Sequence, residues 1–540
     1  MKCLLVLILF INVSLYSQQQ RADSPLSQPS PIENEILIQA QKFQYILQTA
    51  YKNHKDSIDI KKISEAGLNA MLTQLDPYSN YFSAEQYKTM IETYKGSTIG
   101  IGISTILLND TIVVVTVLPG SSADSAGIIT GDKILFVDGQ NVVKTSAAEV
   151  NNKLSGLSGT YSSIIIRRGN TTALNEYRLE KKELPVYSIT THFIIPGTKI
   201  GYIKSLKFSE NANKEFLEAT RDLKSQGMKN LLIDVRGNPG GYLEQVVEMI
   251  DDFVAGGSKI SYTKSRNPEF YREYVSKDGG DFEKIPIIVL IDAQAASGSE
   301  VLAGAVQDLD RGLVVGDISF GKGTVQKFWE FKDGSAFKLT IASYYTPAGR
   351  SIQKPYNQES PALDPSIKMM GNENTQKQIE ETFKMTGGKN KLPVVYSSGG
   401  RALIGGGGIF PDYFAKDDTT TKLTQVLKNY GIFLEFAFRY LNANRQEITS
   451  KYGSNFLNFA KDFIVNDNML NELMNLSKSK NIWNDQMFQI DKEFIRGYVK
   501  AYISFSIWGD PGYHSVMMEF DKPFKKAIEL FPEAEKMLNK

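Results

Sequence analysis

The chain has 540 residues, of which 42% are hydrophobic and 22% charged, a globular composition with room for roughly three or four domains. It carries 61 basic and 60 acidic residues, a net charge of +1. No long basic tract stands out, so a nucleic-acid partner is not expected.

The N-terminus has the layout of a secretory signal peptide. After Met1 and Lys2, residues 3–13 form an apolar run that is too short to span a bilayer comfortably, and small polar residues follow. We expect a signal peptide over residues 1–17, with an uncleaved anchor as the alternative. Cys3, the one cysteine, precedes the hydrophobic core of the signal, so a lipoprotein anchor is not expected. The mature chain would then lack disulfides and thiol catalysis.

The first half of the chain indicates three segments. Residues 18–31 are rich in Gln, Ser and Pro and predict a flexible lead-in. Residues 32–95 carry apolar residues at helical spacing, interrupted at Asp76-Pro77, and predict a small helical domain. Residues 96–184 alternate apolar strands with turns and short helical patterns, which predicts a β-rich domain.

The second half divides into two parts. Strand and helix patterns alternate over residues 185–417, which indicates an α/β domain with parallel pairing. Within it, residues 353–404 are polar and predict a long surface insertion. Residues 418–540 are charged, with aromatics at helical spacing, and predict a C-terminal helical domain.

Histidine and cysteine chemistry is limited in this chain. The three histidines form no His-Glu-x-x-His motif and there are no cysteine pairs, so we do not expect a zinc site. His192 is the candidate base for a Ser-His-Asp triad. The alternative is a half-buried histidine in a strand.

A lysine between two glycines, in SFGKGTVQ, suggests another base. A neutral lysine can activate a serine, but lowering its pKa from about 10.4 to roughly 7 costs about 4–5 kcal/mol, which burial in an apolar pocket can supply. Glycines beside Lys322 would let the backbone pack closely, and Phe320 and Val325 could supply an apolar wall. The alternative is a surface lysine in a flexible turn.

The serine partner is sought where a strand meets a helix. In IDAQAASGSEV, an apolar strand ends at Ile291 and a helix begins near Ser299. Ser297 precedes that helix, where free N–H groups favour developing negative charge. Ser299 is the competing nucleophile, although an N-cap role would explain it.

A third strand-to-helix turn, IDVRGNPGGYL, contains consecutive glycines that could present N–H groups to an anion. The alternative is an ordinary turn. Three such turns after strands of one sheet would gather at the carboxyl ends of the strands, where ligands bind in open α/β sheets.

Together these segments resemble the carboxyl-terminal processing proteases, also called tail-specific proteases. The resemblance covers about residues 35–415 and rests on DVRGNPGG, AASGSEVLAGAVQD, GDISFGKGTVQ, TPAGRSI and GGGIFPD. It implies Ser297 as nucleophile, Lys322 as general base, Gln326 as its supporting residue, and Gly241 and Gly298 as the oxyanion hole. The family usually reads Ser-Ala-Ser-Ala-Ser-Glu where this chain has Ala-Ala-Ser-Gly-Ser-Glu.

The resemblance also implies that residues 96–184 are a PDZ domain, with GSSADSAGIITGDKILFVDGQ as its most specific stretch. Such a domain takes a peptide as an added strand and holds its carboxylate on backbone N–H groups. The carboxylate loop would be Gly100, Ile101, Gly102 and Ile103, with both isoleucines facing the groove. Residues 418–540 lie outside the shared motifs and could serve dimerisation or docking.

The expected fold is therefore a multidomain α+β chain: an α/β protease core, a PDZ domain and helical N- and C-terminal regions. The expected function is that of an exported serine endopeptidase that binds protein C-termini and needs no metal or cofactor. Expected partners are unfolded or tailed proteins, an activating adaptor and a second copy through the C-terminal helices. The periplasm is the expected compartment, with membrane-associated or secreted forms as alternatives. A non-catalytic PDZ scaffold and a His192-dependent protease are the rival functions.

Overall fold

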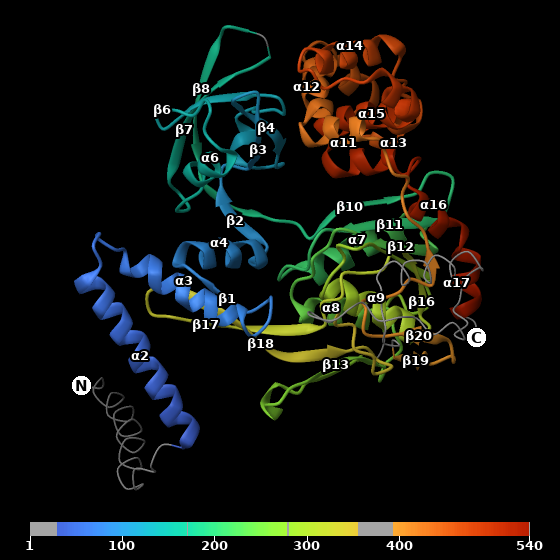
Figure 1. Ribbon diagram of the computed structural model, residues 1–540. Helices are drawn as coiled ribbons and strands as arrows, with labels where there is room; N and C mark the ends of the chain where they lie inside the picture. The colour runs from blue at the N-terminus through green and yellow to red at the C-terminus, as the bar shows by residue number, and fades with distance from the viewer. Residues whose placement is uncertain (1–29, 170, 278–279, 355–392, 539–540) are drawn as a thin grey trace, which may run out of the picture. The chain divides into compact units, whose positions relative to one another are not determined.

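The computed structural model describes residues 30–169, 171–277, 280–354 and 393–538 (Figure 1). The expected signal peptide and most of the lead-in lie outside these residues. The chain forms two compact units, which divide after Leu75. Within the described residues, no helix combines the length and the apolar character that crossing a membrane requires.

The first unit is a pair of helices, α2 (Pro31–Asn53) and α3 (Ile60–Thr73). Ser30 begins α2 with a reciprocal capping box, in which Glu33 Oε2 accepts the Ser30 N–H at 2.7 Å. Asp59 caps α3 by accepting the Lys62 N–H at 3.0 Å. The expected helical domain over 32–95 is thus divided, because α4 (Ala84–Lys95) belongs to the second unit.

The PDZ region is an antiparallel sheet with two short helices. Its strands run in the order β3-β4-β5-β7-β8, with β6 (Gln140–Asn141) paired to β5. Alternating strand residues fill its core, including Ile112, Val114, Ile134 and Ile164. Strands β2 (Ser97–Gly100) and β9 (Lys182–Pro185) pair at its two chain ends. The other elements are β3 (Ile103–Leu108), β4 (Thr111–Val117), α5 (Ser122–Ser125), β5 (Lys133–Val137), α6 (Ala147–Leu154), β7 (Tyr161–Arg167) and β8 (Leu174–Glu180).

The protease core contains a six-stranded sheet in the order β10-β11-β12-β15-β16-β21. Every neighbouring pair is parallel except β10 with β11. Two of its buried strands, residues 287–291 and 312–316, are apolar throughout, as is typical of sheets covered on both faces. Their bounds are β10 (Ile189–Ile194), β11 (Ile200–Ser205), β12 (Asn230–Asp234), β15 (Ile287–Ile291), β16 (Gly312–Gly316) and β21 (Tyr413–Phe414).

Helices cover both faces of this sheet. Ile233 and Val289 point to one face and pack with α7 (Ala212–Ser225), α8 (Leu243–Asp251) and α9 (Gly298–Asp308). The alternate residues Leu232 and Ile288 point to the other face. There they pack against Phe524 and Phe531 of the last two helices, α16 (Lys522–Glu529) and α17 (Phe531–Leu538).

A second, antiparallel sheet has the order β1-β18-β13-β14, with β17 paired to β18. A bulge in the β17–β18 ladder lies between Val325 and Gln326. Part of the expected insertion forms a small hairpin, β19 (Val394–Tyr396) with β20 (Ala402–Ile404), and residues 355–392 lie outside the described chain. The strands are β1 (Asn80–Phe82), β13 (Lys259–Lys264), β14 (Glu273–Val275), β17 (Thr324–Glu330) and β18 (Ala336–Tyr345); a 3₁₀ turn, η1, spans Pro268–Phe270.

The C-terminal region is helical, as expected. Its long helix α15 (Asp485–Met517) kinks at Gly509, where φ is 66°, two residues before Pro511. A contact with the PDZ region is made by Arg445, whose Nη2 donates to Thr130 Oγ1 at 2.7 Å. The other helices are α11 (Lys422–Asn429), α12 (Ile432–Tyr452), α13 (Phe456–Asp462) and α14 (Asp467–Lys478). The expected multidomain α+β fold is confirmed.

Candidate active site

Ser297 lies in the turn between β15 and α9, in a backbone conformation that side-chain-bearing residues rarely adopt. Its φ is 55° and its ψ is −113°, and such strain costs of order 1–3 kcal/mol. The hydroxyl sits at the N-terminal end of α9, where the helix dipole favours negative charge. Ser299, the competing serine, is fully buried and donates to the Asn238 carbonyl at 2.9 Å. Of these two serines, only Ser297 lines the cavity described below.

Two main-chain N–H groups stand beside Ser297, those of Gly241 and Gly298. Within the described residues, neither donates to a protein acceptor. Gly241 packs on the backbone of Phe208 so closely that a Cβ on it would lie 2.0 Å from the Phe208 carbonyl oxygen. Gly240 approaches the serine turn itself, since a Cβ there would lie 2.8 Å from the Ser297 Cβ. The N–H groups of Gly241 and Gly298 are therefore available to donate to an oxyanion that forms next to the Ser297 hydroxyl.

Glu300 links the serine turn to the lysine turn. Its side chain is fully buried. Oε2 accepts the main-chain N–H of Ser297 at 2.8 Å and that of Lys322 at 2.9 Å, while Oε1 accepts the Gly321 N–H at 2.7 Å. Burial raises the pKa of Glu300, and these donors oppose the rise. One carboxylate thus fixes both turns.

Lys322 is held in a tightly packed loop. A Cβ on Gly321 would lie 2.8 Å from the Lys354 Cβ, and a Cβ on Gly323 would lie 2.7 Å from the Gln353 main-chain nitrogen. The flanking glycines are needed because the segment at Gln353 and Lys354 packs directly against them.

Burial, assisted by the nearby charge of Lys338 and opposed by that of Glu300, lowers the pKa of Lys322 from 10.5 to about 8. The lysine Nζ lies 5.2 Å from the ring centroid of Tyr78. Val325 lines the cavity as expected, but Phe320 is 45% exposed and does not contribute to the wall.

Gln326 is oriented by threonines. Its Nε2 donates to Thr324 Oγ1 at 2.9 Å and to Thr340 Oγ1 at 3.3 Å. Thr340 in turn donates to Asp76 at 3.0 Å. The structure shows no hydrogen bond from Gln326 to the amine of Lys322 in the described chain. The bulge beside Val325 explains how adjacent strand residues can both line one cavity.

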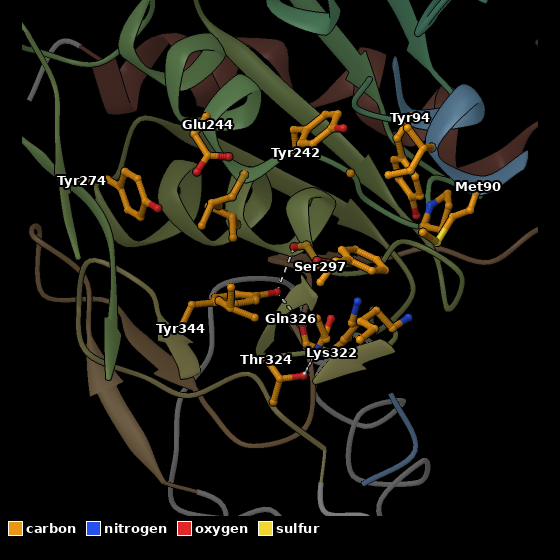
Figure 2. A pocket seen from close by; sticks show the side chains of 18 residues that line it. Met90, Tyr94, Tyr242, Glu244, Tyr274, Ser297, Lys322, Thr324, Gln326 and Tyr344 are labelled. Atoms are coloured by element: carbon orange, nitrogen blue, oxygen red, sulfur yellow. Dashed lines mark hydrogen bonds between the residues drawn. The ribbon is translucent and has the colours of Figure 1, made fainter. Parts of the chain in front are cut away.

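Ser297, Lys322 and Gln326 line one cavity of about 310 Å³ (Figure 2). The Tyr344 hydroxyl lies within hydrogen-bond reach of the Ser297 and Lys322 carbonyls, with one proton to share between them. Among the described residues, no hydrogen bond joins Ser297 Oγ to Lys322 Nζ. The remaining wall is largely apolar and aromatic and includes Met90, Ile91, Tyr94, Leu243, Val301 and Phe328.

His192 lies elsewhere. It is on β10, the edge strand of the core sheet, and its Nε2 lies 3.2 Å from Asp222 Oδ2 at the surface. It is not part of the cavity wall. The structure therefore does not bring the alternative base to Ser297.

Comparison with known proteins agrees with this arrangement. Residues 199–368 match the model of peptidase family S41, and residues 88–163 match the PDZ domain. The carboxy-terminal-processing protease of Bartonella bacilliformis is 34% identical over 299 residues, which make up 55% of this chain and 68% of that protein. This chain belongs to peptidase family S41. It is therefore a serine-type peptidase that carries a PDZ domain.

This S41 peptidase is also similar to other known proteins. The carboxy-terminal processing protease CtpB of Bacillus subtilis is 31% identical over 346 residues, 64% of this chain and 71% of CtpB. A solved structure of a photosystem II D1 C-terminal processing protease covers 57% of this chain and 83% of its own at 27% identity, with a TM-score of 0.33. Residues 423–509 match a family of unknown function, DUF8443.

The expected carboxylate loop of the PDZ domain is only partly open. Ile101 is 2% exposed and packs in the domain core, so its side chain does not face a groove as we expected. Ile103 is half-buried at the start of β3, the edge strand of the sheet. Gly102 has a φ of 90°, and a Cβ on it would lie 2.1 Å from the Ser121 Cβ. Gly100 ends β2 opposite Lys182. Peptide binding at these residues stays a prediction.

Sequence reasoning missed three residues that organise the S41 site: Glu300, Tyr344 and Asp76. Glu300 lies in the motif AASGSEVLAGAVQD, three residues after Ser297. This spacing is the signal that could have identified it as a partner of the Ser297 N–H. Tyr344 and Asp76 act from other strands and turns, and no local pattern connects them to the site.

Proposed function

We propose that this S41 peptidase is an exported endopeptidase that recognises protein C-termini through its PDZ domain and cleaves them with a Ser297–Lys322 dyad. One observation carries the proposal. Lys322, whose pKa burial lowers to about 8, lines the same cavity as Ser297, beside two unpaired N–H groups. A lysine with that pKa is partly neutral near physiological pH and can accept a proton.

The reaction begins when Lys322 Nζ comes within hydrogen-bond reach of Ser297 Oγ, a contact that often tightens only when substrate binds. Oγ attacks the scissile carbonyl carbon while its proton passes to Nζ. The carbonyl oxygen becomes an oxyanion and is held by the N–H groups of Gly241 and Gly298. Collapse of the tetrahedral intermediate breaks the C–N bond, and the ammonium of Lys322 protonates the leaving amine.

The resulting acyl-enzyme is resolved by water. Neutral Lys322 takes a proton from the water as its oxygen attacks the ester carbon, and the same N–H pair holds the second oxyanion. Lys322 then returns the proton to Ser297 Oγ as the acid product leaves. Both the acylation and the deacylation step use residues of this chain.

The cavity and the PDZ domain define the substrate. The apolar and aromatic wall around Ser297 fits an apolar side chain beside the scissile bond. Strand β3 is the edge strand of its sheet, and an extended C-terminus can add to that edge. An unfolded or tailed protein with an apolar C-terminus meets both requirements. The N-terminal apolar run in the sequence supports export, and the periplasm is the destination that we propose.

The test is degradation of an unfolded protein with an apolar C-terminal tail in the presence of a chelator. Wild type is compared with Ser297→Ala, Lys322→Ala and His192→Ala. Loss of cleavage in Ser297→Ala and Lys322→Ala, with cleavage retained in His192→Ala, supports the dyad. Full activity in Lys322→Ala contradicts it, and loss in His192→Ala would assign the base to His192. Binding of the tail without cleavage by wild type would favour a PDZ scaffold.

A further inference from the structure

A buried cluster of charges joins the C-terminal end of the chain to the loop that carries Gly241. Arg236 donates to Asp234 through Nε at 3.0 Å and Nη2 at 2.6 Å. The same guanidinium donates to Asp521 through Nη1 at 2.9 Å and Nη2 at 2.6 Å. We call Asp234, Arg236 and Asp521 the clasp. Both contacts are bidentate, the strongest geometry for an arginine and a carboxylate.

Little water reaches the clasp, so solvent cannot take the place of a charged partner that is removed. Asp234 is fully buried, and the side chains of Arg236 and Asp521 are 15% and 19% exposed. Lys204 joins the cluster, with Nζ 3.0 Å from Asp234 Oδ1. The carboxyl of Asp417 also lies close enough to interact with Arg236, although Asp234 and Asp521 are its bidentate partners. Removing the charge of Asp521 would take one of these two partners from Arg236, and a largely buried charge that loses a partner is strongly unfavourable.

Asp521 is itself fixed by the core. It caps α16 by accepting the N–H of Phe524 at 2.8 Å. The Phe524 side chain is 3% exposed and packs on the core sheet. Asp521 lies outside the ranges that match the S41, PDZ and DUF8443 models. A residue beyond the matched domains therefore reaches the loop of the catalytic one.

That loop runs from Arg236 to Gly241 and is hydrogen-bonded to the serine turn at Gly237 and Asn238. The Gly237 N–H donates to Asp292 at 2.9 Å, and Asp292 also accepts the Ala295 N–H in the serine turn. The Asn238 carbonyl accepts the Ala296 N–H at 3.0 Å. The loop is thus tied to the serine turn on one side and to Asp521, through Arg236, on the other.

We propose that Asp521 is a positioning residue: through Arg236 it holds the 236–241 loop so that the Gly241 N–H points at the oxyanion. The inference rests on the proposed role of Gly241. Asp521 does not touch substrate, so its loss weakens transition-state binding and leaves ground-state binding intact.

The kinetic test compares Asp521→Asn with Glu533→Gln in the full chain, using a fluorogenic peptide with an apolar C-terminus. Asn can still cap α16, so the variant removes mainly the charge. Glu533 accepts a hydrogen bond from Tyr413 at 2.6 Å and is a second polar tie of the C-terminal helices to the core sheet. We expect kcat of Asp521→Asn to fall about tenfold or more, short of the 10²–10³ for a lost oxyanion donor, with KM unchanged. Glu533→Gln should retain wild-type kcat.

A double-mutant cycle tests the route through Arg236. If Asp521 acts through Arg236, Arg236→Gln and Arg236→Gln/Asp521→Asn should have the same kcat. A further fall in the double variant, or a wild-type kcat in Asp521→Asn, would overturn the proposal.

Hydrogen exchange tests the positioning of the loop independently of the proposed function, because it does not require an active enzyme. It also does not depend on whether an Arg236 variant folds. The hydrogen-bonded amides of Arg236, Gly237, Asn238 and Gly240 should exchange about tenfold faster in Asp521→Asn, and at the wild-type rate in Glu533→Gln. Unchanged exchange in Asp521→Asn would overturn the clasp's role even if the enzyme is active. If Ser297→Ala retains full activity, the proposed function fails, while faster exchange would still support the positioning of the loop.

Discussion

Glu300 Oε2 accepts the main-chain N–H of Lys322 at 2.9 Å. The same oxygen accepts the N–H of Ser297 at 2.8 Å. The proposed nucleophile and the proposed base are therefore positioned by a shared buried carboxylate, which is bonded to their main-chain N–H groups. Fixing reactive groups through their backbone leaves their side chains free to meet over the substrate.

Replacing Glu300 with Gln should damage both turns. An amide turns donor hydrogens toward N–H groups that need an acceptor, so we expect a loss of about 2–4 kcal/mol of folding stability and at least about tenfold in kcat. Urea unfolding and peptide cleavage measure the two effects. Glu215→Gln is the matched control, because Glu215 also accepts two main-chain N–H groups, those of Ser188 and Ile189. It should lose stability with an unchanged kcat, and equal kcat losses would argue against a specific role for Glu300.

The pH profile should report Lys322. Since only the neutral amine accepts a proton, kcat/KM should rise with pH through about 8. Initial rates between pH 5 and pH 10 would measure this. A rise centred near ~6.5 would instead indicate histidine.

Lys322→Met should be inactive but more stable than wild type. The folded protein disfavours the charged amine, whose pKa falls from 10.5 to about 8, while the unfolded chain accepts that proton freely. Below about 8 the penalty is fully present, and it disappears as pH rises toward 10.5. We expect a gain of about 1–3 kcal/mol at pH 7, decreasing above about 8, in urea unfolding. Ser297→Ala, also inactive, should show no such pH-dependent gain, and a destabilised Lys322→Met would contradict the burial argument.

In Lys338→Met, the rise of kcat/KM with pH should shift to higher pH. Lys338 lines the cavity, its charge lowers the pKa of Lys322, and its Nζ lies 5.5 Å and 6.0 Å from the ring centroids of Phe82 and Phe328. Methionine removes the charge and keeps an unbranched side chain of similar length. The control is Lys327→Met, an exposed lysine on β17 that also lies over aromatic rings. An unchanged profile in Lys338→Met would show that burial alone sets the pKa.

Gly241→Ala should abolish activity. Its φ is 154°, and the added Cβ would meet the Phe208 carbonyl at 2.0 Å, so the loop must move. We expect a fall in kcat of about 10²-fold or more. Gly257→Ala is the control, since its φ of 78° carries similar strain but no atom lies within 4 Å. Comparable losses of activity in both variants would point to general strain.

The sequence predicted the parts of this site that are local. The strand, the turn and the helix around Ser297 each leave a pattern within a dozen residues, and Lys322 is marked by its two glycines. The Ser297 φ of 55° leaves no such pattern, because the rest of the fold imposes it. Nor could Arg236 be paired with Asp521, which lies 285 positions away.

The surfaces against which apolar segments pack could not be predicted from the sequence either. Periodicity shows that a segment has an apolar face, but not what that face packs against. Residues 418–540 were therefore read as one helical region, although α16 and α17 pack on the protease sheet. For the same reason Ile101 was expected in a groove and lies in the core.

The covering of the core sheet by Phe524 and Phe531 sets an order of events in biosynthesis. These residues follow β21, the last strand of that sheet in the chain, so one face of the sheet stays bare until they have been made. Contacts between such distant parts of a chain form late in folding. The core sheet is therefore covered on both faces only after α16 and α17 have been synthesised. A nascent chain in which Ser297 and Lys322 have already emerged still lacks one side of the core that carries them.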